Sequence, residues 1–277
     1  MATRRPTAIT SLAEAPDDGK LNWLVYGKSG EGKTVLSGTA PKSLFLTTEA
    51  AGTESAKAFG STADEWVCDS WADLQEAYRY LRDGGCADYD WALMDSISEM
   101  EELCWKDQLE EAHASNKSRS VYQAAIQDYA IVDNKVKALV DSFNRLPVNV
   151  LYTAQVMALG TEDAEGDDIT MRLPLIGRIK GGAPLSNKIC GKVTMIGLLV
   201  VKEGEGKDAE PFRRLVTAGG ETWVAKDRHD TFGAWIDNPD IAEMEESVIA
   251  RKAQGSRNNV KPAVVKKTPT KGKGKVA

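Results

Sequence analysis

The stretch that decides the fold is GKSGEGKT, at residues 27–34. It places three glycines within six residues and follows them at once with a lysine and a threonine. An ordered glycine loses more conformational entropy on folding than any other residue, so such a cluster needs a reason. Residues 21–26, LNWLVY, predict a strand before it, and VLSGTA predicts a helix after it. A glycine-rich loop between a strand and a helix directs backbone N–H groups toward an anion.

The spacing fits the pattern G-x-x-x-x-G-K-[ST], the Walker A phosphate-binding loop. In such loops the lysine contacts the β- and γ-phosphates of a nucleotide, and the hydroxyl of the last residue binds Mg²⁺. A simple surface turn would need neither Lys33 nor Thr34. The predicted nucleotide-binding residues of the loop are therefore Gly27, Lys28, Ser29, Gly30, Glu31, Gly32, Lys33 and Thr34.

A phosphate-binding loop requires an acid at the end of another buried strand, and the stretch WALMD supplies Asp95. This is the Walker B form, in which the Asp helps to hold Mg²⁺. The alternative is that Asp95 only caps a helix that begins near Ser96, because Asp is a frequent N-cap residue. We favour the metal role, with Thr34 and Asp95 as the magnesium ligands.

ATP hydrolysis also needs a group that orients water, but Ser96 rather than a Glu follows Asp95. Glu49, at the end of the predicted strand 43–48, is the best substitute. Glu99 is a second candidate, although a solvated helix acid is the simpler interpretation for it. Gln155, at the end of a later strand, is placed to sense the γ-phosphate, or else has a structural role. The predicted catalytic residues are Glu49, Lys33 and Gln155.

Strands alternate with helices as far as Gln155, which predicts an α/β fold with a mostly parallel sheet flanked by helices. Predicted strands cover 21–26, 43–48, 64–69, 90–96 and 148–155, and predicted helices cover 70–85, 98–114 and 121–146. Residues 156–191 are rich in Gly and Pro and are expected to be irregular. An antiparallel C-terminal extension is expected at 192–203, 212–218 and 222–226. The predicted domains are a flexible arm (1–19), a core (20–240), and a helical end with a basic disordered tail (241–277).

Composition excludes several classes of protein. The four cysteines are scattered without a Cys-x-x-Cys pair, and neither of the two histidines lies near one, so zinc and disulfide frameworks are not expected. No apolar run reaches the length of a membrane span, and no secretory signal follows the basic N-terminus. We therefore expect a cytoplasmic protein without a membrane partner. Nine Lys or Arg and no acid lie in 247–277, which leaves the first 246 residues with a net charge of -15 and suggests a polyanionic partner.

This set of motifs resembles the RecA-like P-loop ATPases, in which the catalytic Glu follows the second strand and a Gln follows a later one. In its size and in the stretch WVAKDR (223–228), the chain resembles the short phage-encoded RecA-core proteins that act as single-strand annealing recombinases. The likeness covers about residues 20–236. It implies ATP and Mg²⁺ as cofactors, assembly into a ring or filament, and location in the host cytoplasm if a phage encodes the protein. It also implies that Lys226 and Arg228 reach the nucleotide of a neighbouring subunit; two exposed basic residues at a strand end are the alternative.

The resemblance places a DNA-binding loop just after Gln155. Five acids lie between Leu159 and Asp168, and from 169 to 202 the chain carries basic residues but no acid. Basic, glycine-bearing loops suit sequence-independent contact with single-stranded DNA, although no aromatic residue is present for base stacking. A solvated loop is the alternative. The predicted DNA-binding residues are Arg172, Arg178, Lys180 and Lys188.

The function favoured by the sequence is therefore ATP-dependent binding of single-stranded DNA for homologous recombination or strand annealing, with Mg-ATP hydrolysis coupled to DNA binding. A single-strand-binding protein is a possible further partner. Two alternatives stay open. One is a P-loop kinase acting on a small molecule, and the other is a nucleotide-switched assembly protein such as a helicase loader.

Overall fold

The structure is a computed structural model, which describes residues 19–49, 51–162, 167–178, 184–204 and 210–254. Its strands are β1 (Asn22–Gly27), β2 (Ser43–Thr47), β3 (Asp64–Val67), β4 (Trp91–Asp95), β5 (Asn149–Glu162), β6 (Asp168–Pro174), β7 (Met195–Lys202), β8 (Phe212–Val216), β9 (Lys226–Asp227) and β10 (Trp235–Asp237). Its helices are α1 (Lys33–Ser37), α2 (Glu54–Ala58), α3 (Trp71–Arg82), α4 (Ile97–Ser115), α5 (Ile126–Phe143), α6 (Pro184–Cys190) and α7 (Ile241–Ala253), with a 3₁₀ turn η1 (Gly85–Ala87). The predicted arm (1–19), apart from Gly19, and the part of the predicted tail from 255 onward lie outside the described residues.

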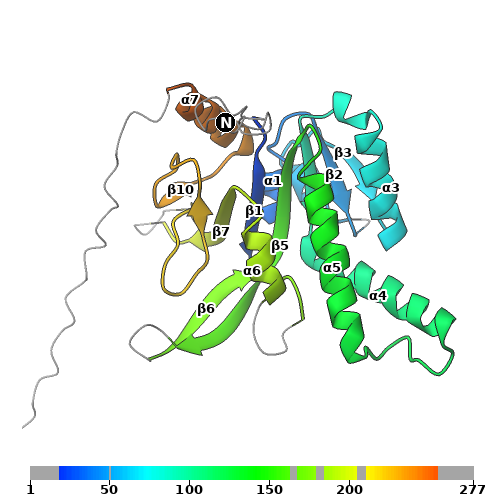
Figure 1. Ribbon diagram of the computed structural model, residues 1–277. Coiled ribbons are helices and arrows are strands. Elements are labelled where there is room, and N and C mark those ends of the chain that lie inside the picture. The colour runs from blue at the N-terminus through cyan, green and yellow to red at the C-terminus, as the bar shows by residue number, and fades with distance from the viewer. Residues whose placement is uncertain (1–18, 50, 163–166, 179–183, 205–209, 255–277) are drawn as a thin grey trace, which may run out of the picture.

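One sheet runs through the molecule in the order β10-β8-β7-β1-β5-β4-β2-β3 (Figure 1). The pairs from β7 to β3 are parallel, whereas β8, β9 and β10 pair antiparallel at the C-terminal end of the chain. The predicted fold class, a mostly parallel sheet flanked by helices with an antiparallel C-terminal extension, is confirmed. Because only β5 separates β1 from β4, the loop after β1 and the acid that ends β4 share one edge of the sheet.

Helices cover both faces of the sheet, and successive residues of β1 point to opposite faces. Leu24 and Tyr26 join a cluster that includes buried residues of α3, α4 and α5. Trp23 and Val25 join a second cluster with buried residues of α1, α2 and α7. A slip of one residue would exchange the two sets, so burial on both faces fixes the register of β1.

The expectation of irregular structure at 156–191 is wrong. β5 continues past Gln155 to Glu162 and pairs with β6 as an antiparallel ribbon, which projects from the body in Figure 1. Apolar residues on one side of the ribbon pack together, with Met157 and Leu173 buried. Of the acidic run, Glu162 and Asp168 pair across the ribbon and both are exposed to water, whereas Asp163 and Glu165 lie outside the described residues. The alternation of buried and exposed side chains along this segment therefore favours a strand, although its Gly and Pro content suggests a loop.

Two other elements differ from their predictions. The helix expected over 121–146 covers only Ile126–Phe143, and the strand expected over 222–226 is reduced to Lys226–Asp227. The late start of α5 has a local cause, because Asp128 accepts a hydrogen bond from the backbone N–H of Ala125 at 2.7 Å. This contact holds the preceding loop in a non-helical path.

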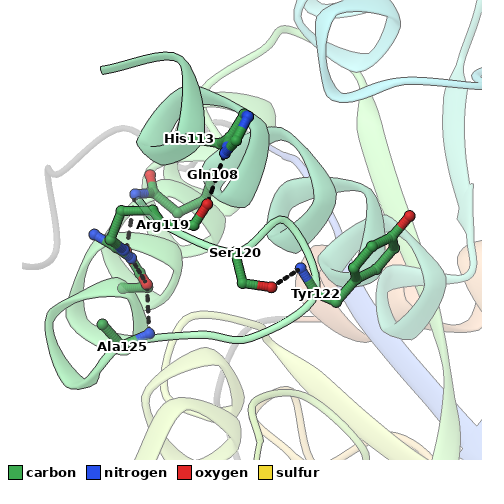
Figure 2. A network of polar contacts seen from close by, with 7 residues as sticks. Gln108, His113, Arg119, Ser120, Tyr122 and Ala125 are labelled. Carbon is green, nitrogen blue, oxygen red and sulfur yellow. Dashed lines mark hydrogen bonds and ion pairs between the residues drawn. The ribbon is translucent and has the colours of Figure 1, made fainter. Parts of the chain in front are cut away.

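The same carboxylate organises the connection between α4 and α5, and Figure 2 labels its partners Gln108, Arg119 and Ala125. The Asp128 side chain is 1 % exposed and forms an ion pair with the Arg119 guanidinium. Gln108 donates to Asp128 at 3.2 Å, and Nδ1 of His113 donates to the Arg119 carbonyl at 2.6 Å. Because every one of these groups is paired, the buried carboxylate is tolerated and the loop is held against α4.

Removing the cation of this pair exposes the cost of burying the carboxylate. We expect Arg119→Ala to lower the free energy of unfolding by about 3 kcal/mol, because it leaves Asp128 as an uncompensated buried charge. Arg145→Ala, at an exposed arginine after α5, is the control and should change stability by less than about 0.5 kcal/mol. Urea denaturation of both variants measures the difference, and equal midpoints would contradict this account of the network.

Candidate functional site

The loop between β1 and α1 has the conformation that its glycines permit. Gly30 and Gly32 adopt positive φ angles of 83° and 91°, a region that other residues rarely enter. The Lys33 side chain folds back over the loop and donates to the carbonyl oxygens of Gly27 at 3.0 Å and Lys28 at 2.9 Å. Burial lowers the pKa of Lys33, while the nearby carboxylates of Asp95 and Glu31 oppose that shift.

The first glycine of the loop is required for a different reason. A Cβ atom at Gly27 would lie 2.6 Å from the backbone oxygen of Leu199 in β7 and 2.6 Å from the carboxylate of Glu31. That carboxylate accepts a hydrogen bond from the N–H of Lys28 at 2.9 Å. Gly27 therefore lets the neighbouring strand and the side chain of Glu31 approach the base of the loop together.

Asp95 is held from two sides at the end of β4. The hydroxyl of Thr34 donates to one carboxylate oxygen at 2.6 Å, and the hydroxyl of Thr153 in β5 donates to the other. Ser96, not Asp95, caps α4, because its side chain accepts a hydrogen bond from the N–H of Glu99 at 3.4 Å. The capping alternative for Asp95 is therefore wrong.

A cavity of about 320 Å³ opens above these residues at the carboxyl edge of the parallel strands. Its walls include most of the phosphate-binding loop, Asp95 and Glu99, together with Glu49 after β2 and Gln155 in β5. Residues that the sequence placed at the predicted ends of four different strands thus line one cavity. Crevices at this edge are where open α/β sheets bind their ligands.

The backbone at Gln155 is fixed by a small hydrogen-bond network. Its N–H donates to the hydroxyl of Ser98 at 3.1 Å, and its carbonyl accepts from the N–H of Leu175 at 2.7 Å. The same hydroxyl donates to the carbonyl of Leu175 at 2.7 Å. The first turn of α4, the cavity wall and the chain just after β6 are therefore joined at this residue.

Several further residues at this site were not predicted from the sequence, among them Thr153, Phe59 and Arg213. Thr153 lies two residues before Gln155, so the two share one face of β5 and this spacing was a usable signal. Phe59, after α2, lines the cavity although its side chain is 72 % exposed. Arg213 in β8 also lines it, and no motif connects that residue to the loop.

Lys226 and Arg228 do not line the cavity of their own chain. Nζ of Lys226 donates to the carbonyl of Cys190, and Arg228 donates to the carbonyl of Gly191 at 2.8 Å. Both cations thus satisfy carbonyl groups at the end of α6, where positive charge is favoured. Burial lowers the pKa of Lys226, and the nearby charge of Arg228 adds to that effect.

The predicted DNA-binding residues have different surroundings. Arg172 in β6 and Lys188 in α6 are exposed. Arg178 is already engaged, since it pairs with Glu102 at 2.9 Å and lies over the Trp105 ring at 4.3 Å from the centroid. Lys180 lies outside the described residues.

The donor set at the cavity fits a magnesium–nucleotide complex. Thr34 and Asp95 bring a hydroxyl and a carboxylate oxygen together, and such oxygens are the ligands that Mg²⁺ prefers. Within the described part of the chain, no group of three or more His, Cys, Asp or Glu side chains could hold a metal. At phosphate-binding loops Mg²⁺ usually takes its other ligands from phosphate and water.

Fold and site together define a P-loop nucleotide-binding protein. The chain belongs to the AAA domain family AAA_24, whose model matches residues 20–229. Among solved structures it is similar to the crystal structure of the RadB recombinase, with 11% identity and a TM-score of 0.39 over 71% of this chain and 79% of that one. No curated protein sequence matches significantly. None of the helices in the described ranges is long and apolar enough to cross a membrane.

The close packing at the base of the loop is testable. We expect Gly27→Ala to lower the free energy of unfolding by about 2 kcal/mol, because the added Cβ overlaps a backbone oxygen that cannot move alone. Gly160→Ala in β5 is the matched control, since its Cβ would meet nothing within 4 Å. Thermal unfolding of the two variants checks the expectation, which is wrong if both melt like the wild type.

Proposed function

We propose that this protein is a Mg²⁺-dependent ATPase that binds single-stranded DNA in homologous recombination or strand annealing. One observation carries the proposal, which is that Gln155 joins the cavity of the phosphate-binding loop to the chain that follows β6. ATP state and DNA affinity would be coupled through this residue. The family match supports the nucleotide-dependent part, and the DNA-binding part depends on charge and position.

The chain's own residues suit ATP hydrolysis. The N–H groups of the loop and Lys33 would hold the phosphates, and Thr34 with Asp95 would hold Mg²⁺. The bound Mg²⁺ would neutralise charge that develops on the phosphate oxygens. Glu49 faces the same cavity and is exposed, so its carboxylate can accept a proton from an attacking water.

The coupling would pass through hydrogen bonds that already exist. A change at the Gln155 side chain on loss of the γ-phosphate would disturb its backbone bonds to Ser98 and Leu175. Gly177 follows two residues later, and its N–H donates to the buried carboxylate of Glu101 in α4 at 2.5 Å. The segment that leads to Arg178 is thus tied to the helix that starts beside Asp95.

Of the predicted DNA-binding residues within the described ranges, Arg172 and Lys188 are exposed, and we propose that they contact DNA phosphates. Arg178 would first have to leave Glu102. The acids near the end of the β5–β6 ribbon would repel DNA, so contact is expected along the base of the ribbon and α6 rather than at its end.

Assembly into a ring or filament is part of the proposal. Lys226 and Arg228 do not face their own cavity, and they would reach the nucleotide of a neighbouring subunit. A single-strand-binding protein is a further proposed partner, and the cytoplasm is the proposed location, that of the host if a phage encodes the protein.

ATP turnover is the first test. We expect Lys33→Ala to abolish both ATP binding and turnover, and Glu49→Gln to lower turnover at least 100-fold while binding is retained, because only the base for water is lost. Glu54→Gln, at an exposed acid of α2, should turn over ATP like the wild type. Phosphate release measured with and without single-stranded DNA reports both steps. Unchanged turnover in Glu49→Gln would refute its catalytic role.

DNA binding is tested separately by its salt dependence. We expect affinity for an oligonucleotide of mixed sequence to fall steeply with salt, and Arg172→Ala with Lys188→Ala to reduce the slope by about one each. Lys57→Ala, at an exposed lysine of α2, is the control and should leave the slope unchanged. Fluorescence anisotropy gives the slopes. ATP turnover with no DNA affinity at any salt would overturn the recombination part of the proposal.

A further inference from the structure

The antiparallel extension brings β8 close to the phosphate-binding loop. β7 pairs with β1 only as far as Leu198, which lies opposite Tyr26, and then continues to Lys202. β8 pairs with this overhanging part of β7, and Arg213 lies opposite Val201. Arg213 therefore lies beyond the end of β1, beside the phosphate-binding loop rather than beside β1 itself.

Alternation along β8 decides which face Arg213 occupies. Leu215, two residues later, is fully buried in the same cluster as Leu36 of α1, so Arg213 is on the face that carries the loop and its helix. The adjacent Arg214 points to the opposite face. It pairs with Asp237 through two contacts of 2.5 Å and 2.8 Å.

Arg213 is held in place by the chain around it. Its Nε donates to the carbonyl of Glu31 at 3.1 Å, and a Cβ on Gly32 would overlap its guanidinium. Its backbone is bonded in both directions to Asn238, with Arg213 N–H donating to Oδ1 at 3.3 Å and Asn238 N–H donating to the carbonyl at 2.6 Å. The side chain is thus positioned by β8, by the segment after β10 and by the loop itself.

One N–H of the guanidinium is used in this way, and its two terminal NH₂ groups form no hydrogen bond or ion pair with the described residues. Arg213 lines the same cavity as Lys33. The Glu31 carboxylate accepts a hydrogen bond from Lys28 N–H, and within the described residues no ion pair joins it to Arg213. A planar guanidinium with two free NH₂ groups matches the oxygens of a phosphate and can bind them bidentately.

We infer that Arg213 binds the polyphosphate of the nucleotide held in its own chain. The inference rests on the proposed nucleotide binding and adds to it a cation from the same subunit. The antiparallel strands are then part of the nucleotide site. The Arg213 contribution should be present in a single subunit, unlike the contribution proposed for Lys226 and Arg228 across an interface.

The experiment measures affinity by calorimetry for three probes: Mg-ATP, magnesium with inorganic triphosphate, and adenosine. We expect Arg213→Ala to weaken binding of Mg-ATP and of triphosphate about tenfold, as loss of a charge-assisted hydrogen bond implies, with adenosine unaffected. Arg213→Lys should restore part of the loss because it keeps the charge. Arg214→Ala, the matched control on the opposite face, should bind all three probes like the wild type.

Each other outcome is decisive. If wild type binds and Lys33→Ala does not, but Arg213→Ala binds triphosphate normally, this inference is overturned while the proposed function stands. An equal loss for triphosphate and adenosine, with a lower melting temperature, would mean that Arg213 only supports the loop, and it too overturns the inference. A wild type that binds neither Mg-ATP nor triphosphate overturns both.

Discussion

The structure depends on the parallel pairing of β1 between β5 and β7. This pairing sets the height at which the glycine loop leaves the sheet, and it brings the backbone oxygen of Leu199 so close to Gly27 that no side chain fits there. Because a slip of one residue would move Trp23 and Tyr26 into clusters that are packed for other side chains, the register of β1 is fixed. The position of every group around the cavity follows from that register.

Polar contacts then fix the orientation of the groups that the sheet brings to the cavity. Asp95 is oriented by hydroxyls from two other segments, one after β1 and one in β5, so its carboxylate faces the cavity without being free to rotate. Ser98 performs a similar task for the backbone of Gln155. These contacts hold the groups around the cavity in defined positions, and preorganisation of this kind lowers the entropic cost of binding.

The long connection between α4 and α5 shows a different use of polar groups. Asp128, in the first turn of α5, is buried, and its partners come from α4 and from the loop between the two helices. Such a network stabilises little compared with apolar packing, but it penalises alternative conformations of the loop strongly. The loop thus has a defined shape while Tyr122 within it remains almost fully exposed.

Local patterns were sufficient for much of this protein. The glycine spacing, the apolar run that ends in Asp95 and the alternation of strands and helices predicted the fold class and the edge where the loop, Glu49 and Gln155 meet. They failed at 156–191, where Gly and Pro content suggested a loop but cross-strand packing of Met157 and Leu173 forms a ribbon. They also did not find Thr153, Phe59 or Arg213.

A motif records residues that are near in sequence, and the sequence by itself therefore determined the phosphate-binding loop and its class of fold. Only the tertiary structure decided that β8, about 180 residues away, lies beside that loop, because pairing between distant strands depends on burial over the whole sheet.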